Sequence, residues 1–205
     1  MTDQKDKDKQ VDHSKRRFLA AATTVVGGVG LAAAAYPFAA SWLPSQRAQA
    51  AGAPVEVDIS KLPPGAQMTV EWRGRPIWII HRSPEAIEKL GGHDDRLRDP
   101  TSSVDQQPAY AQNPHRSLKP QYLILVGLCT HLGCVPKYVA TKEGDDVVLG
   151  ADWPGGFFCP CHGSMFDLAG RVFQGVPAPI NLEVPPHQFV SDKTVIIGIH
   201  HTEEV

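Results

Sequence analysis

Two short cysteine–histidine motifs constrain this chain more than any other feature of its sequence. Residues 129–134 read CTHLGC and residues 159–164 read CPCHGS, and together they contain all four cysteines of the 205-residue chain. Each motif also carries one histidine and one glycine. Thiolates and imidazoles are strong ligands for transition metals. We therefore expect a fold that brings two loops together around a metal centre.

The donor set narrows the kind of metal centre. Two thiolates with two imidazoles match a [2Fe–2S] centre in which two histidines replace two cysteines on one iron, and the neutral imidazoles raise its reduction potential. Structural zinc also takes two cysteines and two histidines, but zinc modules usually open with a pair of cysteines two to four residues apart. The first motif opens with Cys-x-His instead. An iron–sulfur centre is the favoured prediction, with zinc, or four buried free cysteines, as the alternatives.

The two motifs resemble the cluster-binding boxes of the Rieske iron–sulfur family. This resemblance implies that Cys129 and Cys159 bind the inner iron and that His131 and His162 bind the outer one. Ser164 matches the family's serine, whose hydroxyl donates a hydrogen bond to a bridging sulfide. The fold implied is mainly β, a Rieske-type antiparallel domain with a cluster-binding loop subdomain, preceded by one N-terminal transmembrane helix.

The two remaining cysteines distinguish subfamilies. Rieske ferredoxins that serve oxygenases carry only the four ligands, whereas proteins of the cytochrome bc1/b6f type add one cysteine to each box. The resemblance to the second group implies a disulfide between Cys134 and Cys161. Such a bond indicates an oxidising compartment. Closing a loop of this size should stabilise the fold by about 3–4 kcal/mol in the chain-entropy model.

Residues around the boxes carry further family roles. High-potential members have a tyrosine where this chain has Phe166, so the resemblance implies a lower potential here. Residues 175–179 (GVPAP) resemble the Pro loop that covers the cluster from a third side. Leu132, Gly133 and Pro177 match the surface that docks on cytochrome b in the family.

The N-terminus predicts a membrane anchor. Residues 1–17 are polar and end in the SKRRFL motif of residues 14–19, which resembles a twin-arginine export signal. Residues 18–40 carry no charge and are long enough to span a membrane, which takes about 20 apolar residues. Basic residues before this segment and a single arginine after it predict a cytoplasmic N-terminus.

Cleavage of this segment is the alternative to an anchor. Residues 48–50 (AQA) look like a signal-peptide cleavage site, but the apolar run exceeds the usual core of about 7–15 residues. Related bc1 Rieske subunits also keep this helix. We expect an uncleaved anchor, a flexible tether over residues 41–54 and a periplasmic Rieske domain over residues 55–205.

Composition predicts a loop-rich β domain after the anchor, because the chain has 18 glycines and 18 prolines. Its net charge of −2 gives no reason to expect nucleic-acid binding. A helix is expected over 85–90, capped by Ser83, and an irregular surface insertion over 93–120, with His93 and His115 solvated. The expected strands cover residues 68–72, 77–81, 122–126, 147–149, 157–158, 189–191 and 194–197.

Similarity to proteobacterial bc1 Rieske subunits runs along nearly the whole chain. It implies that the chain accepts an electron from ubiquinol at cytochrome b and passes it to cytochrome c1, within a dimeric complex of the bacterial inner membrane. His162 would contact the quinol and take its proton, with His131 also exposed. Such a subunit is not catalytic alone.

Two other functions fit part of the pattern. The small subunit of an arsenite oxidase also joins a Rieske domain to a twin-arginine signal, and it would pair with a molybdenum subunit. A Rieske ferredoxin that serves an oxygenase is disfavoured by the extra cysteines and the apolar N-terminal segment. Co-purification from membranes with haem subunits or with a molybdopterin protein distinguishes these possibilities.

Overall fold

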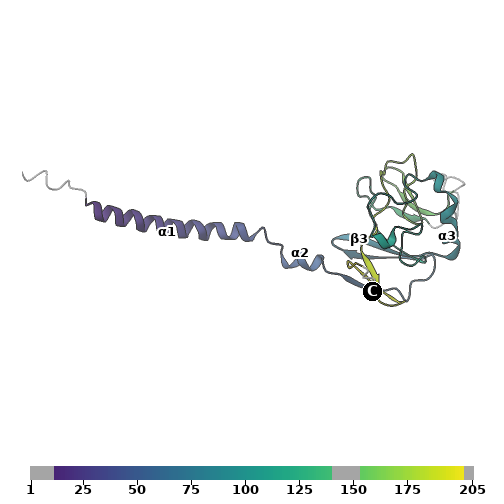
Figure 1. Ribbon diagram of the computed structural model, residues 1–205, viewed down its shortest axis with the longest axis horizontal. Coiled ribbons are helices and arrows are strands. Elements are labelled where there is room, and N and C mark those ends of the chain that lie inside the picture. The colour runs from purple at the N-terminus through teal and green to yellow at the C-terminus, as the bar shows by residue number, and fades with distance from the viewer. Residues whose placement is uncertain (1–11, 140–152, 201–205) are drawn as a thin grey trace, which may run out of the picture. The chain divides into compact units, whose positions relative to one another are not determined.

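The computed structural model describes residues 12–139 and 153–200. The chain divides into two units, Met1–Gln49 and Ala50–Val205 (Figure 1). The first unit holds a long helix and the second holds all the β structure that is described.

The first unit is dominated by helix α1 (His13–Ala40), which is 28 residues long. Asp12 caps its first turn, where the carboxylate accepts hydrogen bonds from the backbone N–H groups of Ser14 and Lys15. None of its residues is buried by the rest of the chain. By length and composition α1 could cross a membrane, although an N-terminal signal sequence meets the same description.

A short helix lies where the sequence predicted a flexible tether. Helix α2 covers Gln46–Ala51, and the hydroxyl of Ser45 accepts a hydrogen bond from the N–H of Ala48 at its start. Alanine and glutamine have high helix propensity, which explains a helical turn in this composition. The four-part division of the chain predicted above stays a prediction.

In the second unit, the described strands form three antiparallel sheets of three strands each. The first sheet has the order β1 (Val55–Asp58), β9 (Thr194–Ile197), β8 (His187–Phe189); the second, β2 (Gln67–Trp72), β3 (Arg75–His81), β4 (Tyr122–Val126); the third, β5 (Lys137–Val139), β6 (Gly156–Cys159), β7 (Ser164–Asp167). Short helices occupy the connections: α3 (Pro84–Glu88), η2 (Lys89–Gly92), η3 (Asp94–Arg96) and η4 (Ala109–Ala111). The prediction of a mainly β, antiparallel fold is confirmed.

The sheet β2-β3-β4 separates two hydrophobic cores. Side chains alternate across a strand, so Ile77 and Ile79 of β3 join one core while Trp78 and Ile80 join the other. The first core also takes side chains from β1 and β9, and the second from β6 and β7. Both faces of β3 are therefore covered, which explains why its central residues are apolar without interruption.

Most predicted elements lie close to where the sequence placed them. The hairpin β2–β3 closes on Arg73 and Gly74, whose φ values of 54° and 70° are typical of a type I′ turn. The strand predicted over 122–126 coincides with β4. Ser83 caps α3 as expected, but the helix gives way to η2 after Glu88. The strand predicted over 147–149 lies outside the described residues.

The prediction for residues 93–120 was partly wrong. The segment is irregular, but His93 is only 5% exposed, its Nε2 lies 3.3 Å from a carboxylate oxygen of Asp167, and its ring stacks on Phe173. His115 is also partly buried, and its carbonyl accepts a hydrogen bond from Arg82. The segment covers the core instead of standing in solvent.

Three arginines are fully enclosed: Arg116 of this segment, together with Arg82 and Arg171. Burial lowers the pKa of Arg82 and of Arg116 to about 10. Their guanidinium groups donate mainly to backbone carbonyls, including those of Leu168 and Leu182. The three side chains thus satisfy loop carbonyls that water cannot reach.

Candidate metal centre

The two cysteine–histidine boxes fold into the same local turn. The N–H of Gly133 donates to the carbonyl of Cys129, and the N–H of Gly163 donates to the carbonyl of Cys159, both over 2.9 Å. The two glycines have φ values of 78° and 77°, in the left-handed region that glycine adopts without strain. The boxes therefore present their first cysteine in the same way.

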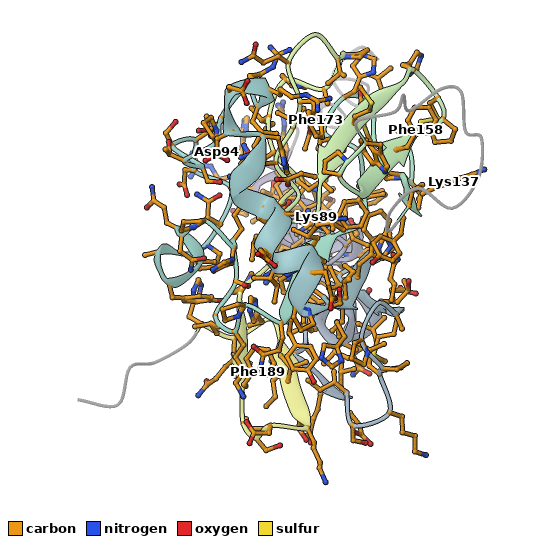
Figure 2. The ribbon with its side chains drawn as sticks, turned by 90° about the vertical axis from the view of Figure 1, so that its right-hand side faces the viewer. Lys89, Asp94, Lys137, Phe158, Phe173 and Phe189 are labelled. Atoms are coloured by element: carbon orange, nitrogen blue, oxygen red, sulfur yellow. A yellow bond between two sulfur atoms is a disulfide. The ribbon has the colours of Figure 1, made fainter. Side chains whose placement is uncertain are left out.

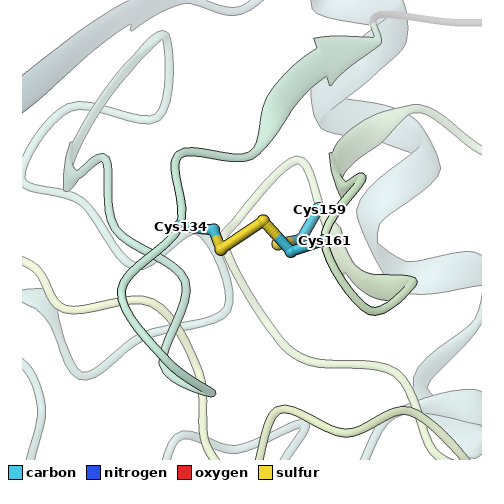
Figure 3. A group of neighbouring side chains, drawn as sticks. All are labelled: Cys134, Cys159 and Cys161. Carbon is cyan, nitrogen blue, oxygen red and sulfur yellow. A yellow bond between two sulfur atoms is a disulfide. The ribbon is translucent and has the colours of Figure 1, made fainter.

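A disulfide joins the two boxes. It links Cys134 to Cys161, whose Cα atoms lie 6.7 Å apart (Figure 3). The cysteine pairing implied by the family resemblance is confirmed. The two cysteines that remain free, Cys129 and Cys159, are both buried.

The possible ligands run from a buried end to an exposed end. Cys129 is 3% exposed and Cys159 is 2% exposed, whereas His131 is half-buried and His162 is exposed. The two imidazole rings contact each other edge to face, with centroids 4.8 Å apart. The arrangement places two thiols inside and two imidazoles at the surface.

This donor set fits a Rieske cluster and no four-cysteine cluster. The sulfur atoms of Cys134, Cys159 and Cys161 all lie within 4.8 Å of one another (Figure 3). Two of these sulfurs are bonded to each other and cannot act as thiolate ligands. Only Cys129 and Cys159 remain to supply thiolates. The histidines of the boxes offer two nitrogen ligands beside them, which is the donor set of a Rieske centre.

The environment of Cys129 favours metal binding over a free thiolate. Burial raises the pKa of its thiol, and the neighbouring Cys159 raises it further. The backbone N–H of His131 and the hydroxyl of Ser164 oppose this effect because they donate hydrogen bonds to the sulfur. A metal ion would displace the proton from such a thiol. The N–H of His131 and the hydroxyl of Ser164 would then stabilise the thiolate that binds the metal.

The Pro loop predicted over 175–179 lies against both boxes. The hydroxyl of Ser164 accepts a hydrogen bond from the N–H of Ala178 over 3.0 Å. The hydroxyl of Thr130 donates to the carbonyl of Ile180 over 2.6 Å. Thr130 was not predicted as a site residue, although its place between two predicted ligands was a usable signal.

The remaining predicted residues fall on the surface or in the core beside the boxes. Leu132 is 70% exposed, and Gly133 and Pro177 are exposed as well. Phe166 is fully buried on β7 and belongs to the same core as Cys129. Docking roles for the three surface residues stay predictions.

Comparison with known proteins gives the same result as the geometry. A family model described as "Rieske [2Fe-2S] domain" matches residues 54–186, and one described as "Ubiquitinol-cytochrome C reductase Fe-S subunit TAT signal" matches residues 5–45. The fold expected from the resemblance is thereby confirmed.

Three relatives are each named "Ubiquinol-cytochrome c reductase iron-sulfur subunit". The relative from Allochromatium vinosum is 58% identical over 92% of this chain and 90% of its own length. The relative from Bradyrhizobium diazoefficiens is 44% identical over 91% of this chain and 96% of its own length. The relative from Rhodospirillum rubrum is 43% identical over 91% of this chain and 93% of its own length. The chain belongs to the family of Rieske [2Fe–2S] iron–sulfur subunits of ubiquinol–cytochrome c reductase.

Proposed function

We propose that this chain is the electron-transfer subunit of a ubiquinol–cytochrome c reductase and that four residues hold its cluster. Cys129 and Cys159 would bind one iron, and His131 and His162 the other. The observation that carries this assignment is the pair of buried free thiols beside two surface imidazoles, with the other two cysteines joined in a disulfide. When bound, the [2Fe–2S] cluster supplies a one-electron acceptor of raised potential.

The histidines give the chain a way to handle a proton. His162 is exposed, so its ring can meet a ligand that approaches the tip of the domain. An imidazole can accept a hydrogen bond from a quinol hydroxyl and take its proton near neutral pH. The ring of His131 contacts that of His162 and is half-buried, so its exposed part can meet the same ligand.

The partners follow from the family and from the surface around the histidines. Leu132 and Val135 are 70% and 53% exposed, so an apolar patch adjoins the histidines. Such patches mark protein interaction sites. We assign this patch to docking on cytochrome b, where ubiquinol is oxidised. Cytochrome c1 would then accept the electron from the cluster. The helix α1 would anchor the chain in the bacterial inner membrane, with the domain in the periplasm.

Single substitutions test the ligand set. Cys129→Ala, His131→Ala, Cys159→Ala and His162→Ala should each abolish the EPR signal of the reduced cluster in purified membranes. The double variant Cys134→Ser/Cys161→Ser is the control, because it removes two cysteines of the same boxes and should leave part of the signal. A normal spectrum in any single variant would remove that residue from the ligand set.

Co-purification tests the partners. The detergent-solubilised wild-type chain should carry haem b and haem c subunits and support ubiquinol-dependent reduction of cytochrome c. A molybdopterin subunit in their place would contradict the assignment and favour arsenite oxidation.

A further inference from the structure

Two residues of the Pro loop and the residue that follows it are held by side chains from three different segments. The carbonyl of Val176 accepts a hydrogen bond from Arg98, 3.1 Å away. Two residues later the N–H of Ala178 donates to Ser164, and two residues later again the carbonyl of Ile180 accepts from Thr130. Ser164 and Thr130 belong to the two boxes, whereas Arg98 comes from outside them.

Arg98 belongs to a segment that runs along the start of the Pro loop. Its backbone N–H donates to the carbonyl of Val172, and Leu97 pairs with Phe173 in an isolated β-bridge. In return the side chain of Gln174 donates to the carbonyl of Leu97 over 2.9 Å. Figure 2 shows Phe173 and the neighbouring Asp94 at the end of the domain opposite Phe189.

Arg98 and Gln174 thus form a reciprocal clamp, with each side chain bonded to a backbone carbonyl of the other segment. Both residues are exposed, and the backbone contacts between the segments do not depend on their side chains. The clamp is therefore separable from the packing of the core. The clamp restrains the stretch of loop that runs from Gln174 to the amide of Ala178.

The Ala178 amide links this clamp to the predicted ligands. Because the oxygen of Ser164 accepts from that amide, its hydroxyl proton stays free for another acceptor. The family resemblance implies that this acceptor is a bridging sulfide of the cluster. Val176 and Ala178 are 8% and 0% exposed and share a core with Cys129. A shift of the loop would displace the Ser164 hydroxyl from the cluster site.

We propose that Arg98 and Gln174 are positioning residues that fix the Pro loop and, through the Ala178 amide, hold the Ser164 hydroxyl toward the cluster site. The proposal rests on the cluster site assigned under the proposed function. Hydrogen bonds to cluster sulfurs raise the reduction potential. Loss of either side chain should therefore lower the midpoint potential and expose the Ala178 amide to exchange.

The test uses Gln174→Ala and Arg98→Met in the full-length protein. Both variants should show a lower midpoint potential in redox titration, with the cluster content per chain unchanged. Hydrogen exchange at Ala178 should become about two- to tenfold faster, the range expected for loss of one hydrogen bond. Arg73→Met, at the β2–β3 turn, is the control and should change neither quantity.

The two variants also separate positioning from charge. Gln174→Ala alters no charge, and the field of the exposed Arg98 is screened in concentrated salt. A fall confined to Arg98→Met that disappears at high salt would overturn the proposal, as would faster exchange with an unchanged potential. Absence of a Rieske signal in the wild-type protein would instead refute the ligand assignment.

Discussion

At the scale of single residues, Phe166 is the departure from the family pattern with the clearest consequence, because high-potential members have a tyrosine at this position. Its side chain is fully buried on β7 and shares a core with Cys129 and Cys159, so it adjoins the proposed ligands without offering a hydrogen bond. Phe157 lies opposite it on β6. An apolar ring here adds no donor beside the hydroxyl of Ser164, which acts to lower the pKa of the Cys129 thiol against its burial.

Phe166→Tyr should raise the midpoint potential. The added hydroxyl lies at the position from which tyrosine donates to a cysteine ligand in related proteins, and such a bond stabilises the more negative, reduced cluster. One hydrogen bond contributes about 0.5–1.5 kcal/mol net. This corresponds to a rise of about 20–65 mV for a one-electron couple, measurable by redox titration.

Ser164→Ala provides the opposite case in the same strand. It removes the hydroxyl expected to donate to a bridging sulfide and the acceptor of the Ala178 amide, so the potential should fall by a similar amount. An unchanged or lowered potential in Phe166→Tyr would show that residue 166 does not reach the sulfur.

The roles that sequence could predict at this scale are local ones. The resemblance of the two boxes to a known family pointed to Cys129, His131, Cys159 and His162 as ligands, and this assignment stays a prediction. The partners of Arg98 could not be inferred, because its bond to Val176 joins residues 78 positions apart. Such contacts depend on the path of the chain and leave no periodic trace in the sequence.

At the scale of elements, Asp167 joins the third sheet to the segment that covers it. Its carboxylate accepts from the side chain and the N–H of Arg171 and contacts His93. Burial alone would raise the pKa of Asp167, but the contact with His93 and the charge of Arg171 outweigh it, so the pKa is lowered. Arg171 in turn bonds Asp94 and the carbonyl of Leu90.

Asp167→Asn should destabilise the domain strongly. It leaves the buried guanidinium of Arg171 without its enclosed counter-ion, and breaking one side of a buried pair costs about 3–5 kcal/mol. The free energy of unfolding, from denaturant titration of the full-length protein, measures this loss. Asp192→Asn is the matched control, since it removes an exposed carboxylate paired with Lys119 and should have little effect.

The pH dependence gives a second readout for the same carboxylate. Because folding lowers the pKa of Asp167, its stabilising contribution is present above the pKa of the unfolded chain and is lost as the pH falls through the folded value. The wild type should therefore lose more stability in acid than Asp167→Asn. Equal acid sensitivity of the two proteins would show that Asp167 is not the group responsible.

Strands were predictable and the covering segment was not, for a physical reason. β3 and β4 are apolar runs bounded by turn residues, and a hairpin needs only neighbouring residues to form. Residues 93–120 look polar because their charged side chains satisfy loop carbonyls far away in sequence, as the bond from Arg116 to Leu182 does across 66 positions. The polar composition of this segment therefore predicted exposure to solvent, whereas the fold buries several of its polar side chains.

At the scale of the whole molecule, α1 has the length and composition of a membrane anchor. As a helix, the apolar run from Phe18 to Ala40 is about 34 Å long, enough for a hydrocarbon core of about 30 Å. Aromatic residues follow toward its end, with Tyr36, Phe38 and Trp42 all exposed. Tryptophan and tyrosine favour membrane interfaces.

We predict that α1 is retained as the anchor. Membranes washed with alkaline carbonate should keep the chain, and its intact mass should include residues N-terminal to Ala50. Val29→Lys with Leu31→Arg places two charges at the centre of the apolar run, each costing about 2.5–3.5 kcal/mol there, and should weaken membrane retention. The control pair Thr23→Val with Thr24→Val keeps the segment apolar and should leave retention unchanged. A soluble periplasmic protein that begins at Ala51 would show instead that the segment is a cleaved export signal.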